Sequence, residues 1–191
     1  MSTLACLLEE PSAQAMLEGV LPKILPDGVI PKYIVFEGKQ DFEKRIEKKL
    51  KNWQIPHTYF LLLRDQDAGN CREIKDSIVL KCANARKTGS LVRIACKELE
   101  SFYLGDLEAV EKGLELSGLS NNQGKRKYRN PDLLGNPSQE LIKVTGKKYQ
   151  KVAGSRSIAP HLKLDLSNCS PSFNALITGL RRLFMECHKQ E

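Results

Sequence analysis

The chain has 191 residues, of which 41% are hydrophobic and 28% are charged, and these fractions are typical of an ordinary globular protein. No apolar run reaches the length of a membrane span, and the first residues lack a basic region followed by an apolar one. We therefore expect neither a membrane protein nor a signal peptide. The length predicts one domain with additions, large enough to bury a proper core.

The formal net charge of +7 is unevenly distributed along the chain. Residues 1–120 contain 17 Lys and Arg against 18 Asp and Glu, a net charge of −1, whereas residues 121–191 contain 13 against 5, a net charge of +8. This asymmetry predicts a surface that faces a polyanion, with DNA or RNA as the obvious partner. A solvated, lysine-rich surface would give the same counts.

The six cysteines are scattered, with no Cys-x-x-Cys pair and no matching His spacing. Disulfides and a zinc site are therefore not expected. Free, mostly buried thiols in a reducing cytoplasm are the expected state. The cysteines are Cys6, Cys71, Cys82, Cys96, Cys169 and Cys187.

Short apolar runs in the first half predict β-strands, and one of them, beginning at Thr58, reads TYFLLLRDQD and suits a strand buried on both faces. Helically spaced apolar residues separate these runs. The alternation predicts an α/β fold with a mainly parallel four-stranded sheet covered by helices. The predicted strands are Thr3–Glu9, Lys32–Phe36, the run from Thr58, and Leu91–Cys96; the predicted helices are Ser12–Leu25, Asp41–Trp53 and Cys71–Ala85.

The helix predicted at Asp41–Trp53 is strongly charged. Its acidic residues Glu43 and Glu47 and its lysines Lys44 and Lys48 have the spacing of exposed i, i+4 pairs. We therefore expect this side of the helix to be a solvated face.

After residue 106 the pattern becomes helical and basic. The segment Asn121–Asn130 is a polar, basic connector and the segment least expected to be ordered. The division predicts an α/β core at 1–106 and a basic, mostly helical extension at 107–191 that packs on the core. The predicted helices of the extension are Leu107–Leu116, Ser138–Thr145, Ser157–Leu162 and Pro171–Cys187.

Acidic residues follow three of the predicted strands. Ligands of parallel sheets bind beyond the carboxyl ends of the strands. Asp65 and Asp67 share a face if the extended backbone continues through Gln66, and such a carboxylate pair suits Mg²⁺. The acidic residues are Glu9 and Glu10 after the first strand, Asp65 and Asp67 after the third, and Glu98 and Glu100 after the fourth.

Each acidic pair also has a plainer interpretation. Asp65 and Asp67 are equally suited to open a solvated turn into Ala68–Asn70. The two glutamates after the first strand suit the N-terminus of a helix. Glu98 and Glu100 suit surface pairs with Arg93 or Lys97.

The segments LLEEPSAQAML, RDQD, RIACKELESFYLGD and YQKV resemble a bacterial Toprim-related group, domain of unknown function 4276. Toprim domains occur in topoisomerases, primases and the overcoming-lysogenization-defect nucleases. The resemblance covers nearly the whole chain, and its most specific parts are the Arg-Asp-Gln-Asp and Glu-Leu-Glu segments. It implies a Toprim-like fold.

The resemblance also implies a metal site. Glu9 matches the Toprim glutamate after the first strand, although Glu10 stands where the family usually has Gly, and Pro11–Ala13 lack the acid often found there. The Asp-x-Asp pair matches Asp65 and Asp67. The implied ligands of Mg²⁺ or Mn²⁺ are Glu9, Asp65, Asp67, Glu98 and Glu100, and the implied catalytic residues are Glu9, Asp65, Asp67, Glu98 and Lys151.

Only one of Glu98 and Glu100 is expected to reach this site, because on a helix they diverge by roughly 200°. Glu98, nearer the strand end, is favoured. Lys151 and Arg156 would provide donors aimed at the scissile phosphate. Nucleic acid would be bound by Lys147, Lys148 and Arg156, with a base stacked on Tyr149.

The implied activity is metal-dependent cleavage of phosphodiester bonds in DNA or RNA. An alternative is a non-catalytic module that binds nucleic acid and docks to a partner, such as the ATPase of a two-component bacterial defence system. A further alternative is a regulatory Toprim relic in which the acids bind metal for structure. Metal-dependent cleavage separates the first activity from the other two.

Overall fold

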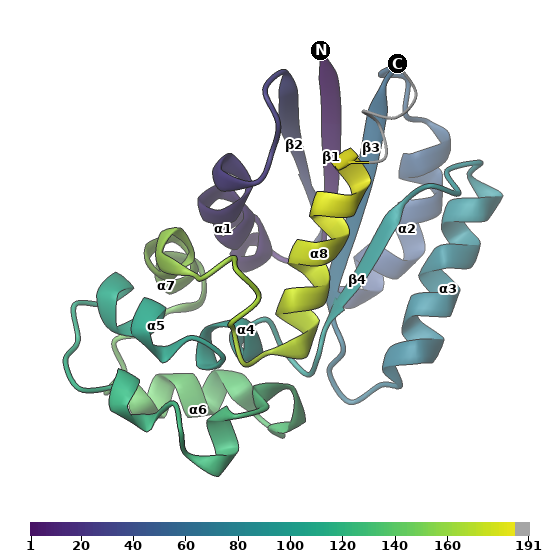
Figure 1. Cartoon of the computed structure of the whole chain (residues 1–191). Helices are drawn as coiled ribbons and strands as arrows, with labels where there is room; N and C mark the ends of the chain where they lie inside the picture. The colour runs from purple at the N-terminus through teal and green to yellow at the C-terminus, as the bar shows by residue number, and fades with distance from the viewer. Residues whose placement is uncertain (186–191) are drawn as a thin grey trace.

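A computed structural model describes residues 1–185 of the chain, and its central feature is a four-stranded, all-parallel sheet in the order β2-β1-β3-β4 (Figure 1). The parallel pairing confirms the predicted architecture. β3 is central and its last six residues are buried, as its apolar run predicts. The strands are β1 (Ser2–Leu8), β2 (Val29–Val35), β3 (Thr58–Asp65) and β4 (Leu91–Ala95).

Helices cover both faces of the sheet (Figure 1). On one face, α2 (Lys39–Lys51) and α3 (Cys71–Asn84) pack on alternate strand residues such as Leu7 and Leu62. On the other face, α1 (Pro11–Val20) and α8 (Pro171–Met185) pack on the intervening residues, such as Leu8 and Leu61. The period of two along each strand therefore divides the core into two layers.

The hydrophobic layer between the sheet and helices α1 and α8 continues into four smaller helices, which lie beyond the end of the sheet (Figure 1). The connector predicted at Asn121–Asn130 is part of this packed structure, because it contains two 3₁₀ turns and Tyr128 is buried. The Tyr128 hydroxyl donates a hydrogen bond to Glu140 at 2.6 Å. The elements are α4 (Glu100–Leu104), α5 (Leu107–Gly113), α6 (Pro137–Val144) and α7 (Lys151–Ile158).

The helix predicted at Ser157–Leu162 is wrong in its position. The structure has α7 from Lys151 to Ile158, followed by a 3₁₀ turn at Ala159–His161. Lys151 and Arg156 therefore lie on a helix and not in the segment that precedes one. The final helix begins at Pro171 as predicted, and the residues predicted to end it, Glu186 and Cys187, lie outside the described residues.

The five cysteines within residues 1–185 are all unpaired. Cys6 and Cys82 are buried, and the other three are partly exposed, so fewer thiols are buried than predicted. Within the same residues, no helix has the length and apolar character needed to cross a membrane.

Candidate functional site

The carboxyl ends of β1, β3 and β4 meet at one edge of the sheet. The backbone N–H of Glu9 donates to the Leu63 carbonyl at 3.3 Å, and that of Gln66 donates to the Ala95 carbonyl at 2.9 Å. Glu9 Oε2 also accepts a hydrogen bond from the backbone N–H of Asp65, at 3.1 Å. The first two acidic segments singled out in the sequence are therefore in direct contact.

Asp65 and Asp67 do not share a face. β3 ends at Asp65, and Asp67 has a φ of +55°, in the left-handed region, so the alternation of an extended strand does not reach it. The Asp67 carboxylate lies 3.7 Å from Lys39 Nζ and 3.6 Å from Arg64 Nη2. Asp65 instead continues the series of Leu61 and Leu63, which face α1 and α8. Asp65 and Asp67 therefore lie on different sides of the sheet.

Asp65 is buried at the centre of an acidic environment. Asp65 is the last residue of the central strand and is only 8% exposed. This burial raises the pKa of its carboxyl group well above the usual value. The neighbouring carboxylates of Glu10, Glu100 and Glu9 raise it further, against a smaller opposing effect of Lys151. A carboxylate in such surroundings favours a proton or a bound cation.

Glu100, the first residue of α4, is completely buried. One carboxylate oxygen accepts a hydrogen bond from the Tyr149 hydroxyl at 2.9 Å, and the other is buried without a hydrogen-bond partner among the described residues. Burial raises the pKa of Glu100, against the opposing charge of Lys151. An orphaned carboxylate oxygen next to Asp65 is a second sign of uncompensated negative charge.

Two predicted roles are corrected by these contacts. Glu98, favoured from the sequence, instead accepts a hydrogen bond from the backbone N–H of Ser138 at 2.7 Å, near the start of α6, and Glu100 is the residue that faces Asp65. Tyr149 is only 3% exposed and binds Glu100, so its ring has no free face on which a base could stack. It is part of the core beneath the site.

Lys151 lies at the first position of α7, beside α1. Its ammonium group donates to Glu10 Oε2 at 3.1 Å. Burial lowers the pKa of Lys151, but the carboxylates of Glu100, Glu10 and Asp65 outweigh this effect and the pKa is raised. Lys151 therefore stays charged. It lies at the end of the sheet that carries Glu9, Glu10, Asp65 and Glu100, which we call the acidic edge.

Arg64 also belongs to this edge and was not among the predicted site residues. Glu10 was among the acidic residues singled out after the first strand, but not among the implied metal ligands. Arg64 lies on β3 with a completely buried side chain, and its guanidinium contacts Glu9, Glu43 and Asp67. Glu43 therefore lies in an ion pair and not on a purely solvated face. The sequence feature that could have identified Arg64 is its place as a cation directly after an apolar run. For Glu10, the feature is its position next to Glu9, a predicted metal ligand.

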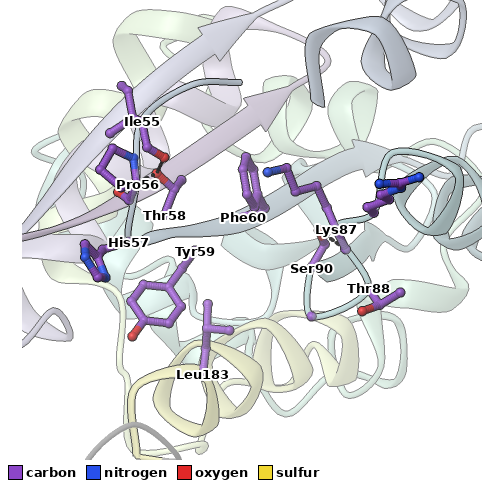
Figure 2. A pocket seen from close by; sticks show the side chains of 12 residues that line it. Ile55, Pro56, His57, Thr58, Tyr59, Phe60, Lys87, Thr88, Ser90 and Leu183 are labelled. Carbon is purple, nitrogen blue, oxygen red and sulfur yellow. Dashed lines mark hydrogen bonds between the residues drawn. The ribbon is translucent and has the colours of Figure 1, made fainter. Parts of the chain in front are cut away.

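The remaining predicted nucleic-acid residues are exposed. Lys147, Lys148 and Arg156 make no side-chain hydrogen bond or ion pair within residues 1–185. A pocket of about 580 Å³ lies at the opposite, amino-terminal end of β3 and β4, between the segments 55–60 and 86–90 (Figure 2). Among residues 1–185, its lining contains Arg86 and Lys87 and no Asp or Glu, and it lies at the opposite end of the strands from the acidic edge.

The carboxylates at this edge are chemically suited to a divalent metal, although their side chains are not gathered around a single point. In the part of the chain described, no three His, Cys, Asp or Glu side chains come together closely enough to hold an ion. The raised pKa values of Glu9, Asp65 and Glu100 and the orphaned Glu100 oxygen nevertheless indicate an excess of oxygen donors and of negative charge. Carboxylate oxygens are the ligands that Mg²⁺ prefers.

Comparisons with known proteins identify the fold. A family model described as a domain of unknown function (DUF4276) matches residues 8–181. The C-terminal region of the Burkholderia pseudomallei OLD protein has a similar structure, with a TM-score of 0.54, 15% sequence identity, and coverage of 94% of this chain and 97% of that chain. A comparison with curated proteins found no match. The match to the OLD region confirms the predicted Toprim-like fold.

Proposed function

The chain belongs to the DUF4276 family, and on that premise we propose that it is a Toprim-type nuclease that cleaves phosphodiester bonds of DNA or RNA with the aid of Mg²⁺ or Mn²⁺. The observation that carries the proposal is the buried Asp65 at the carboxyl end of the central strand, with Glu9 bound to its backbone N–H and a buried oxygen of Glu100 that has no partner among the described residues. The charges of Glu10, Glu100 and Glu9 all raise the pKa of Asp65. A purely structural site gains nothing from this arrangement, because like charges that are buried together destabilise the fold.

We assign metal binding to Glu9, Asp65, Asp67 and Glu100. Glu9 links the two sides of the sheet, because it accepts from the Asp65 N–H and also contacts Arg64, which in turn contacts Asp67. A divalent ion held there would supply a water of lowered pKa and positive charge beside the phosphate. Lys151 is placed to orient or neutralise the substrate phosphate, since its charge is secured by the surrounding carboxylates. Glu98 has no part in this assignment, because its described contact is with Ser138 and the carboxylates that act on Asp65 are those of Glu10, Glu100 and Glu9.

The substrate class follows from charge. The basic excess lies in residues 121–191, and Lys147, Lys148 and Arg156 provide exposed cations. Contacts of this kind bind nucleic-acid phosphates without reading sequence. The resemblance to two-component defence nucleases extends the proposal to an ATPase partner, which co-purification from cells that express both proteins would test.

Titration calorimetry with Mg²⁺ and Mn²⁺ tests the metal site. Wild type is compared with Asp65→Asn and with a matched control, Asp76→Asn, which changes an exposed aspartate on α3. We expect wild type and the control to bind Mn²⁺ equally, and Asp65→Asn to bind it at least tenfold more weakly. Equal binding by all three proteins would place any metal elsewhere and sink the proposed site.

Cleavage is tested on single- and double-stranded DNA and RNA with the same variants. Metal-dependent cleavage that is lost in Asp65→Asn and kept in Asp76→Asn supports the nuclease. Salt-sensitive binding of nucleic acid that survives in Asp65→Asn, without cleavage by any of the proteins, would instead favour the non-catalytic binding module.

A further inference from the structure

Arg64 is a buried cation beside two of the proposed metal ligands, Glu9 and Asp67. Its side chain lies on the face of the central strand that α2 and α3 cover, and it is 0% exposed. Burying a guanidinium is costly unless its charge is neutralised and its donors are satisfied. Three carboxylates from separate parts of the chain, Glu9, Glu43 and Asp67, oppose its charge.

The contacts of the Arg64 guanidinium are of two kinds. Nη1 forms a close ion pair with Glu43 on α2, and Nε donates to the Asp65 carbonyl at 2.9 Å. Its contacts with the proposed metal ligands are looser, 3.5 Å from Nε to Glu9 Oε2 and 3.6 Å from Nη2 to Asp67 Oδ2. Nη2 has no hydrogen-bond partner within residues 1–185. The guanidinium is thus anchored at one side and only approaches the ligands at the other.

We propose that Arg64 is a positioning residue that orients Glu9 and Asp67 at the metal site through loose contacts, and that Glu43 keeps these contacts loose by anchoring the guanidinium. This inference rests on the proposed function, because it concerns the ligands of the same metal site. Because of the Glu43 anchor, the Glu9 and Asp67 oxygens are not taken up by the arginine. Without the anchor, the guanidinium closes on both carboxylates and competes with the metal.

Glu43 is the residue on which to test this inference. It lies on α2 with a side chain that is 46% exposed, and its backbone carbonyl accepts a hydrogen bond from Lys81 at 2.5 Å, a contact that does not depend on its side chain. Glu43→Gln therefore removes the charge and leaves the helix in place. The matched control is Glu47→Gln, one turn further along α2, which removes a surface pair with Lys51.

We expect Glu43→Gln to weaken Mn²⁺ binding about tenfold in calorimetry, the lower end of the range found when partners of metal ligands are removed. Glu43→Gln should also lower the melting temperature of the metal-free protein, because it removes the closest partner of a buried charge. Glu47→Gln should bind Mn²⁺ and melt like wild type. A second variant, Arg64→Lys, keeps the charge but loses the planar fork that reaches all three carboxylates, and should also bind Mn²⁺ more weakly.

The outcomes separate the two proposals. If wild type binds Mn²⁺, Asp65→Asn does not, and Glu43→Gln binds like wild type, the role of Arg64 and Glu43 is overturned while the metal site stands. If wild type and Asp65→Asn behave alike, the proposed function itself fails. Nitrogen-15 NMR of the Arg64 side chain adds a metal-independent readout: an unchanged guanidinium spectrum in Glu43→Gln would also overturn the inference.

Discussion

Ionisation of Asp65 is unfavourable in the folded protein, and this opposes folding at a pH where the unfolded chain is ionised at this position. The pKa of Asp65 in the folded protein is raised by burial and by neighbouring carboxylates. The folded state therefore binds a proton more readily than the unfolded state, so the contribution of Asp65 to stability is favourable at low pH. That contribution is lost as the pH rises through the folded pKa.

Asp65→Asn should therefore stabilise the metal-free protein at pH 7 to 8. Removing an uncompensated buried charge is expected to add about 1–2 kcal/mol to the free energy of unfolding. The gain should shrink as the pH is lowered toward the unfolded pKa of roughly 4, where both proteins are neutral at this position. Thermal melts across this pH range measure it, and Mn²⁺ should reverse the order by stabilising wild type.

The control for this prediction is Asp76→Asn, which changes an exposed carboxylate on α3 and should leave the melting temperature within about 1–2 °C of wild type. If Asp65→Asn were less stable than wild type throughout the pH range without metal, Asp65 would be a stabilising partner in the fold. The charge excess that supports the metal site would then be absent.

Single residues of the site were only partly predictable. Glu9 and Asp65 follow from their positions at strand ends, and both meet at the expected edge. The left-handed turn at Asp67 was not predictable, since the Asp-Gln-Asp spacing fits an extended strand equally well. The pairing of Glu43 with Arg64 joins residues 21 positions apart, and a run of surface charges gives no sign of such a contact.

At the scale of the elements, apolar periodicity located every strand to within a few residues. The largest deviation is β2, which begins at Val29 and not at Lys32, because Pro31 is tolerated on an edge strand. α7 was placed too late because Gln150 offers no side-chain cap and Gly154 lies inside the helix. Packing with α1, and not local propensity, defines that helix.

α7 is held by unusually close helix contacts. A Cβ added at Gly113, the last residue of α5, would lie 2.6 Å from the Ile158 Cα and 2.6 Å from the Ser157 carbonyl oxygen. Backbone atoms cannot move aside as a flexible side chain does. The approach of α5 to α7, which carries Lys151, therefore requires glycine at this position.

Gly113→Ala should lower the free energy of unfolding by about 1–3 kcal/mol, the usual cost of overpacking. The matched control is Gly135→Ala, since no atom lies within 4 Å of a Cβ added there. Urea unfolding of both variants measures the difference. A Gly113→Ala protein as stable as its control would show that α5 and α7 are not in close contact in solution.

At the scale of the whole molecule, the sheet and the C-terminal helices share one hydrophobic layer. Strand residues such as Leu4 and Leu63 belong to the same cluster as Phe173 and Leu180 of α8. The division into a core at 1–106 and an extension at 107–191 stays a prediction from the sequence. The shared cluster argues against two units that fold separately.

A fragment of residues 1–106 should therefore not fold alone. It would expose the face of the sheet that α8 covers, including Leu61 and Leu63. We expect it to lack a cooperative thermal transition by circular dichroism and to aggregate in size-exclusion chromatography. A fragment that melted cooperatively near the temperature of the full chain would contradict this and support an autonomous core.

The contact between Lys151 and Glu10 spans 141 residues of sequence, and this separation affects when the acidic edge is completed. At a synthesis rate of roughly 5–20 residues per second, Lys151 is added roughly 7–28 s after Glu10. Until then a growing chain has the acids of its first strand without the lysine that faces them. If the chain is a nuclease, the acidic edge stays incomplete until residue 151 has been made, which would delay cleavage of the messenger RNA and DNA of the cell that produces it.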